Sequence, residues 1–207
     1  TLTDSFLKDE DVHSRTAAEI WGVKPHEVTG QMRREAKVIN FGIIYGMSSF
    51  GLSRELAIEP RVAQAYIDDY FTTYRGVRTY LDSVIDQARE KGYVTTLMNR
   101  RRYLPEIKAA NAGVRKFAER TAINAPIQGT AADLIKIAML RIAAALEKKK
   151  MAGRMIIQVH DELVFEAPEE EIEALREMVK EEMEGVITLK VPLKVDINWG
   201  NNWREAH

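Results

Sequence analysis

The chain has 207 residues, enough for one large domain or two small domains with proper cores. Hydrophobic residues make up 45%, charged residues 29%, and the net charge is −1, which is typical of a soluble globular protein and excludes a polycation. The absence of cysteine excludes disulfides and thiolate metal sites. Without an apolar run near the roughly 20 residues of a membrane span, or a secretory pattern at the start, we expect a cytoplasmic protein with no membrane partner.

Helical spacing of apolar residues dominates the first half of the chain. The predicted helices are residues 11–21, Thr29 to about Met47, about Ser49–Ala57, and a run from Arg61 to Ala88 that breaks in two at Gly76. Two short strands, Tyr93–Leu97 and Tyr103–Leu104, are expected on either side of a basic turn.

The second half mixes helices with strands. The pattern from Asn111 to Lys150 predicts two helices joined near Pro126, because proline cannot donate within a helix interior. Apolar runs at Met155–Val159 and Leu163–Glu166 predict a β-hairpin. The last predicted elements are an amphipathic helix over Glu169–Glu184 and a strand over Leu193–Trp199. This order predicts an α+β fold, in which a helical subdomain precedes one with a small antiparallel sheet and flanking helices.

Charge is unevenly distributed along the chain. From Asn99 to Arg120, seven basic residues stand against two acidic ones, and from Asp161 to Glu184, eleven acidic residues stand against two basic ones. This division suits a protein that holds an anionic polymer on one side. On charge alone, however, two solvated faces of opposite sign are the favoured interpretation.

Four residues recur at intervals of four along the second predicted helix: Arg33, Lys37, Phe41 and Tyr45. They lie near one helix face, and its ends are roughly 18 Å apart. Cations near the positive end of the helix dipole suit a polyphosphate, and rings further along suit a sugar and base. The face therefore has the polarity of a nucleoside triphosphate. By spacing alone, a core stripe with solvated basic residues is the better explanation.

A second candidate site is the turn of the predicted hairpin, in the string QVHDELVFE. Asp161 and Glu162 lie there, where two strands hold an exposed carboxylate in place. Magnesium takes hard oxygen ligands, and two ions roughly 3.5–4 Å apart activate a hydroxyl and stabilise a leaving pyrophosphate. For an Asp-Glu pair alone, a polar turn is the favoured interpretation.

The full strings are more specific than these spacings. RREAKVINFGIIYGMS and, later in the chain, MIIQVHDELVFE resemble in sequence and order two motifs of the family A DNA polymerases, the group of bacterial DNA polymerase I. The resemblance extends over essentially the whole chain. It implies template-directed DNA synthesis, the transfer of a nucleotidyl group from a dNTP to a primer 3′-hydroxyl by a two-metal mechanism.

The resemblance also implies roles for individual residues. Those expected at the incoming nucleotide are His13, Arg33, Lys37, Phe41 and Tyr45, with Lys37 also catalytic and Tyr45 beside the templating base. Those expected at the magnesium ions are the catalytic carboxylates Asp161 and Glu162. Those expected at the primer–template DNA are Arg120, Asn124, Gln128 and His160, besides Tyr45. Phenylalanine at position 41 resembles members that discriminate against dideoxynucleotides.

Residues 1–110 are expected to form the fingers subdomain, with the nucleotide-binding helix at about 30–46. Residues 111–207 are expected to form the palm subdomain, with the carboxylate hairpin at about 155–166. The family's first metal-binding aspartate and its thumb fall before Thr1, so one carboxylate for the two Mg²⁺ ions must come from outside the chain. The expected partners are primer–template DNA, dNTP and the upstream part of the same polymerase, without which the chain is expected to be inactive.

Two alternatives remain at this point. The chain is compatible with a non-catalytic, nucleic-acid-binding remnant of a polymerase, since one metal aspartate is missing. It is also compatible, less closely, with a fragment of a single-subunit RNA polymerase, which shares the right-hand architecture. The glutamate that excludes ribose, which would separate DNA from RNA synthesis, also falls before Thr1.

Overall fold

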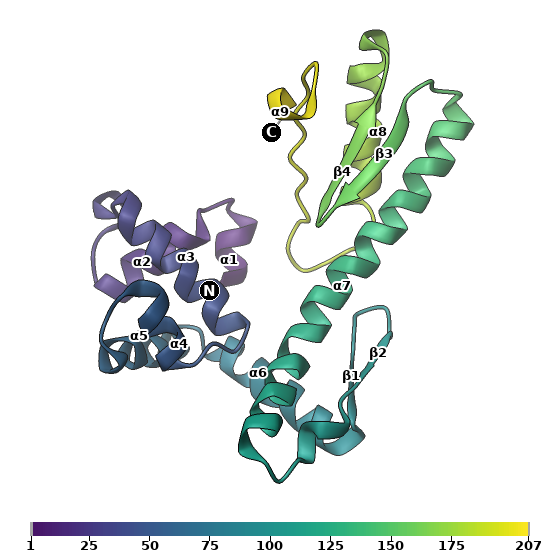
Figure 1. Cartoon of the computed structure of the whole chain (residues 1–207). Helices are drawn as coiled ribbons and strands as arrows, with labels where there is room; N and C mark the ends of the chain where they lie inside the picture. The colour runs from purple at the N-terminus through teal and green to yellow at the C-terminus, as the bar shows by residue number, and fades with distance from the viewer. Residues whose placement is uncertain (1, 207) are drawn as a thin grey trace. The chain divides into compact units, whose positions relative to one another are not determined.

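A computed structural model of the chain describes residues 2–206 (Figure 1). The α helices are α1 (Leu2–Leu7), α2 (Val12–Trp21), α3 (Gly30–Ile44), α4 (Ser49–Leu56), α5 (Pro60–Thr73), α6 (Arg75–Lys91), α7 (Ala112–Lys149), α8 (Ile172–Glu184) and α9 (Trp203–Ala206). Short 3₁₀ helices cover Pro25–Glu27, Pro105–Lys108 and Glu169–Glu171. The strands, paired antiparallel in two separate hairpins, are β1 (Tyr93–Thr95) with β2 (Arg101–Tyr103) and β3 (Arg154–Val159) with β4 (Glu162–Glu166). This combination confirms the predicted α+β class.

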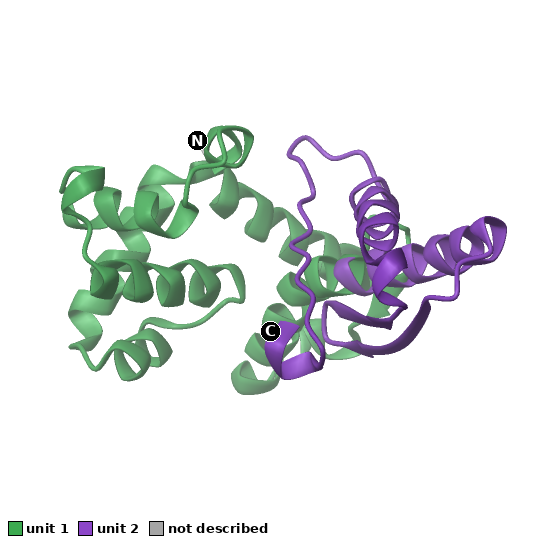
Figure 2. Cartoon of the chain, turned by 90° about the horizontal axis from the view of Figure 1, so that it is seen from above, with its two compact units in different colours: residues 1–130 green, residues 131–207 purple. Residues whose placement is uncertain are grey.

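The described chain divides into two compact units (Figure 2). Unit 1 runs to Thr130 and unit 2 begins at Ala131, so the boundary falls inside α7. Between residues 2 and 206, no helix combines the length and the apolar character that crossing a membrane requires.

Unit 1 contains a core beneath α3, α4 and α5. Its buried side chains are Ile39, Ile43, Leu52, Ala63, Tyr70 and Tyr74. Thr29 caps α3 as predicted, because its hydroxyl accepts a hydrogen bond from the Met32 N–H at 3.2 Å. The buried face of α3 packs on this core, and the opposite face carries the exposed residues of the candidate site.

The break between α5 and α6 lies at Tyr74, so the predicted break at Gly76 is wrong by two residues. Tyr74 has φ −109° and ψ 57°, whereas Gly76 lies in the first turn of α6. The Tyr74 ring is buried 4.8 Å from the Tyr70 ring, and its hydroxyl lies 3.3 Å from the Thr16 hydroxyl. Burial of this ring, rather than the flexibility of a glycine, sets the position of the break.

α7 is one continuous helix of 38 residues, so the predicted division at Pro126 is wrong. Proline lacks one helical N–H, but the hydrogen bonds on either side of it preserve the helix. The Pro126 carbonyl accepts a hydrogen bond from the Thr130 hydroxyl at 2.6 Å, and the same hydroxyl accepts one from the Leu97 N–H at 3.0 Å. The turn that joins β1 and β2 is therefore attached to α7 one turn after the proline.

Unit 2 packs the β3–β4 hairpin and α8 against the second half of α7. The buried core side chains are Ala138, Ile142, Leu175, Met178, Val179 and Val186. The predicted hairpin is confirmed. The predicted helix over Glu169–Glu184 begins as a 3₁₀ turn and becomes α-helical only at Ile172.

The predicted strand over Leu193–Trp199 does not form. Exposure alternates along residues 191–198, as in a strand with one covered face. The Val195 N–H, however, donates to the Glu184 carboxylate at 3.0 Å, and no backbone ladder pairs this segment within residues 2–206. Alternation in the sequence indicates a face, but a strand also requires a partner for its backbone.

Candidate functional site

The face of α3 carries the four residues that the sequence places four apart. Arg33, Lys37 and Phe41 are exposed and Tyr45 is half-buried. The Phe41 and Tyr45 rings stack with centroids 6.1 Å apart, and the Lys37 Nζ lies 6.0 Å from the Phe41 centroid. Cationic and aromatic groups thus follow one another along the helix, in the order that a triphosphate, a sugar and a base require.

The two glycines near the end of α3 pack against protein. A Cβ on Gly42 would lie 3.1 Å from the Met47 sulfur, so this glycine faces the interior. Gly46 has φ +73°, which favours glycine, and a Cβ there would lie 3.3 Å from the Arg120 Cγ on α7. The close approach at Gly46 brings Arg120 beside the Tyr45 end of the α3 face.

Helix α2 contributes an aspartate to the same face. Asp11 caps α2 by accepting from the Ser14 N–H at 2.7 Å, and its other oxygen accepts from Arg33 Nε at 2.7 Å. Burial raises the pKa of Asp11, but the Ser14 N–H and the Arg33 guanidinium outweigh it, so the pKa lies below its ordinary value. Arg33 is thereby held at the N-terminal end of the α3 face by a carboxylate.

His13 also belongs to this face. Its ring centroid lies 5.7 Å from that of Phe41, and its Nδ1 lies 3.1 Å from the Asn40 amide nitrogen. Burial, together with Arg33 and Lys37, lowers the pKa of His13, against the opposing charge of Asp11. The histidine thus lies among the cations and rings of α3 as a weakly basic, half-buried imidazole.

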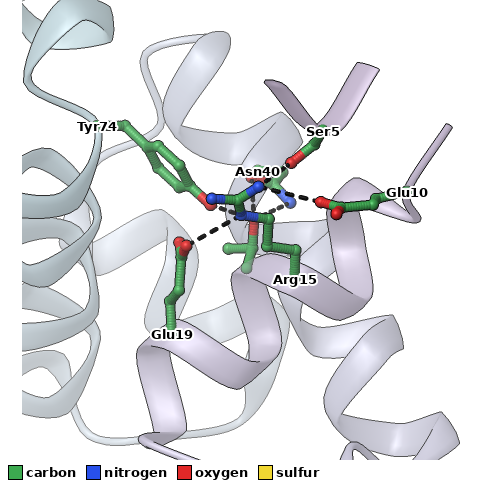
Figure 3. A network of polar contacts seen from close by, with 7 residues as sticks. Ser5, Glu10, Arg15, Glu19, Asn40 and Tyr74 are labelled. Atoms are coloured by element: carbon green, nitrogen blue, oxygen red, sulfur yellow. Dashed lines mark hydrogen bonds and ion pairs between the residues drawn. The ribbon is translucent and has the colours of Figure 1, made fainter. Parts of the chain in front are cut away.

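A polar network joins α2 to the back of α3 (Figure 3). In its interior, the Thr16 hydroxyl bonds to the Asn40 amide and lies 3.3 Å from the Tyr74 hydroxyl. At its edge, Arg15 donates to three oxygens, those of Ser5, Glu10 and Glu19. These contacts set the position of α2, and therefore of Asp11 and His13, relative to α3.

The residues expected at DNA lie along α7 at intervals of four: Arg120, Asn124 and Gln128. Arg120 and Gln128 are exposed, and the Arg120 guanidinium lies 5.8 Å from the Phe117 ring. The Asn124 Oδ1 is buried and has no hydrogen-bond partner among residues 2–206. This spacing puts the three side chains near one face of the helix, with an acceptor at its centre that lacks a donor.

The β3–β4 hairpin ends in the two-residue turn His160–Asp161. His160 has φ +53°, in the left-handed region that few non-glycine residues adopt, and the Gln158 amide donates to the His160 carbonyl at 2.9 Å. The last strand pair is Val159 with Glu162. Asp161 and Glu162 are exposed, so the backbone presents both carboxylates to solvent at the end of the hairpin.

The two carboxylates offer the hard oxygens that Mg²⁺ takes. Within residues 2–206, no three His, Asp or Glu side chains converge as a metal cluster. Magnesium keeps several waters and needs one or two carboxylates plus substrate phosphates, so Asp161 and Glu162 fit as part of a magnesium site. Phosphate oxygens and a further carboxylate would complete it.

The structure thus brings together, in unit 1, five sequence-predicted residues on one face: His13, Arg33, Lys37, Phe41 and Tyr45. Arg120 lies beside Gly46, close to the Tyr45 end of this face. The hairpin carboxylates Asp161 and Glu162 form a separate group in unit 2. Sequence reasoning missed Asn40, whose polar side chain in a helix interior was the available signal. It also missed that Asp11 binds Arg33, and that Gln158 donates a hydrogen bond to the backbone of the hairpin turn.

Comparison with known proteins identifies the family. The model of DNA polymerase family A matches residues 1–205. The chain belongs to DNA polymerase family A. It is 51% identical over 205 residues to DNA polymerase I of Bacillus subtilis and 52% identical over 206 residues to that of Pseudomonas aeruginosa. These matches cover 99% and 100% of this chain but 23% of each relative, so the chain spans about a quarter of their length.

A solved structure matches as well. It is the POL domain of Pol1 from M. smegmatis in complex with DNA primer-template and dNTP, at 43% identity and a TM-score of 0.96. The match covers 99% of this chain and 36% of that one. The predicted resemblance to family A polymerases is therefore confirmed.

Proposed function

We propose that this chain takes part in template-directed DNA synthesis by a two-metal mechanism: it binds the incoming nucleotide, supplies carboxylates for two magnesium ions and contacts the primer–template. The reaction transfers a nucleotidyl group from a dNTP to the primer 3′-hydroxyl and releases pyrophosphate. The observation that carries the proposal is the face of α3, where Arg33, Lys37, Phe41 and Tyr45 follow one another beside His13. The DNA and dNTP in the M. smegmatis complex support the same assignment.

At the nucleotide, Arg33, Lys37 and His13 hold the triphosphate. Lys37 lies one helical turn before Phe41 and therefore nearer the sugar than Arg33, so it carries the charge closest to the reacting phosphorus. The Phe41 ring lies against the sugar and base, and Tyr45, stacked on it at 6.1 Å, borders the templating base. Arg33 and Lys37 are exposed, so they hold the triphosphate only when its phosphates replace the water around these side chains.

At the metal site, Asp161 and Glu162 hold magnesium, with a further carboxylate from outside this sequence. When bound there, magnesium supplies positive charge to the attacking hydroxyl and the leaving pyrophosphate. The left-handed conformation of His160 directs the carboxylate of the next residue, Asp161, outward. The His160 side chain borders the primer end.

At the DNA, Arg120, Asn124 and Gln128 contact the minor groove. Uncharged amides suit this groove, because its acceptors are nearly the same for every correct base pair. We assign residues 1–110 to the fingers and 111–207 to the palm. The compartment we propose is the cytoplasm, where bacterial DNA polymerases meet the chromosome.

The test is a chimera in which this chain replaces the matching residues of the B. subtilis relative. The chimera should extend a primer with dNTP, and the 207-residue chain alone should not, because one of the metal carboxylates is lacking. DNA binding without extension by the chimera would identify a non-catalytic remnant. Preference for ribonucleotides would identify RNA synthesis. Efficient extension by the chain alone would show that another carboxylate of this chain completes the site.

A further inference from the structure

Asn40 is an unusual residue for the middle of a helix. Asparagine is disfavoured in helix interiors, because its side chain competes for backbone hydrogen bonds. In α3 the residue is only 3% exposed, so its side chain must find its partners inside the protein. It adjoins the exposed Phe41 in sequence, but its own amide bonds to Thr16 on α2.

Its amide meets His13 through the nitrogen. The Asn40 Nδ2 lies 3.1 Å from His13 Nδ1 and 3.1 Å from the Thr16 hydroxyl. The Thr16 hydroxyl, in turn, lies 3.2 Å from the Asn40 Oδ1. An amide nitrogen only donates, so Nδ1 must offer a lone pair, and the proton of a neutral imidazole then resides on Nε2. With the amide turned over, Oδ1 would face Nδ1 and require a proton there.

The surroundings of His13 favour the neutral ring. Arg33 and Lys37 on α3 face it as cations, and Asp11 on α2 as the opposing anion. Burial and the two cations outweigh Asp11, so the pKa of His13 lies below its ordinary value. Within residues 2–206, Nε2 has no hydrogen bond to protein. The ring thus has one nitrogen bound internally and a second that is left for a ligand on the α3 face.

We propose that Asn40 is a positioning residue that holds His13 as a neutral Nε2–H donor toward the triphosphate. Asn40 itself does not touch the nucleotide. It orients the imidazole in the way that a second hydrogen bond orients a metal-binding histidine. The inference rests on the proposed function, because the ligand that receives the Nε2–H is the dNTP.

The first test needs no variant. Imidazole ¹⁵N NMR on the 207-residue chain reports which nitrogen of each histidine carries a proton, and His13→Gln assigns the signal. At about pH 7, His13 should be neutral with its proton on Nε2. A proton on Nδ1, in either a neutral or a charged ring, overturns the proposal. This result is independent of whether the chain binds nucleotide or takes part in synthesis.

Asn40→Asp supplies the second test. The new carboxylate accepts from Nδ1–H and favours the imidazolium, so the His13 pKa should rise by about one unit or more. Tyr74→Phe is the matched control, because it removes another hydroxyl of the same buried network without touching Asn40 or His13. Its His13 signal should stay unchanged. An unchanged pKa in Asn40→Asp, or an equal shift in both variants, contradicts the positioning role.

The third test asks whether Asn40 acts through His13. The affinity of the chain for dATP is measured in wild type, Asn40→Leu, His13→Gln and the double variant. Asn40→Leu should weaken binding about fivefold, and the double variant should be no weaker than His13→Gln alone. Additive losses would make Asn40 merely structural and overturn the proposal. If wild type shows no dATP binding while the proton is on Nε2, the proposed nucleotide role fails and the orientation of His13 by Asn40 stands.

Discussion

The α3 face in unit 1 and the β3–β4 turn in unit 2 present functional groups by different means. On the α3 face, side chains hold one another: Asp11 binds Arg33 at 2.7 Å, and Asn40 binds His13 at 3.1 Å. At the hairpin turn, the backbone positions the carboxylates, through the left-handed conformation of His160 and the strand pair of Val159 with Glu162 on either side of the turn.

This difference fits the ligands proposed for the two regions. A nucleotide is long and has distinct ends, so several donors and rings must keep fixed spacings along a helix. A magnesium ion needs few protein oxygens and takes the rest from water and phosphate. For the proposed ion, a short turn with exposed carboxylates is enough, whereas the proposed nucleotide would need two helices joined by a buried polar network.

The largest expected effect is on the hairpin. In the chimera, Asp161→Asn should reduce primer extension by about a thousandfold or more, since it removes a charge from the metal site, but leave DNA binding nearly intact. The turn should survive because the backbone, rather than the carboxylate, holds it. The measurement pairs single-turnover extension with DNA affinity.

Glu166→Gln is the matched control for this variant. Glu166 is the last residue of β4, the strand that follows Asp161, and pairs with the exposed Arg154 at 3.3 Å. Its replacement should change extension by less than about twofold. Equal loss of DNA binding in Asp161→Asn would mean that the aspartate holds the hairpin, and the contrast between the two regions would fail.

Two adjacent arginines on α3 provide the next test. Arg33→Ala should weaken dNTP binding in the chimera about 10- to 100-fold, because it removes a charged donor to the triphosphate. Arg34 lies about 100° further round the helix and is also exposed, so Arg34→Ala should have an effect below about twofold. The measurement is the apparent Kd for dNTP in single-turnover extension. Similar losses in both variants would indicate general electrostatic attraction rather than a defined face.

The sequence predicts the helix and the hairpin turn that carry these two groups of residues, because each depends on local spacing. Four residues at intervals of four need only a helix, and Asp161 with Glu162 needs only a tight turn between two apolar runs. What the sequence does not predict are pairs distant in the chain. Asn40 and His13 are 27 residues apart, and nothing local to either one indicates that their side chains meet.

The errors in the fold have the same origin. Pro126 argues locally for a break, but the helix continues because its other hydrogen bonds remain. Leu193–Trp199 has the alternation of a strand, but pairing depends on another segment. Gly76 is locally flexible, yet the chain bends at Tyr74, where a ring is buried against residues of other helices.

Substitution of Phe41 tests the aromatic end of the α3 face. The chimera should discriminate against dideoxynucleotides, and Phe41→Tyr should relax this discrimination about tenfold. A dideoxynucleotide lacks the 3′-hydroxyl that helps to order its own triphosphate, and a tyrosine hydroxyl near that position would replace a hydrogen bond worth about 1–3 kcal/mol. The test is competition between dideoxy- and deoxynucleotide on one template. An unchanged ratio with normal deoxynucleotide use would place the ring away from the sugar.

The smallest expected effect concerns the ion pair that holds Arg33. Asp11→Ser keeps an N-cap for α2 but removes the carboxylate. Both partners are more than 40% exposed, so the loss in unfolding free energy should stay below about 1 kcal/mol. Because the folded pKa of Asp11 is lowered, its contribution is present above the unfolded pKa and is lost as pH falls through the folded pKa. Wild type should therefore lose more stability than Asp11→Ser in urea titrations as the pH falls from about 5 to about 3.

At neutral pH, dNTP should bind the variant Asp11→Ser slightly more tightly than wild type, since phosphate no longer competes with a carboxylate for Arg33. Weaker dNTP binding with an intact α2 would instead assign Asp11 to orienting Arg33 for its ligand, so that side chains hold one another on this face in the bound state as well.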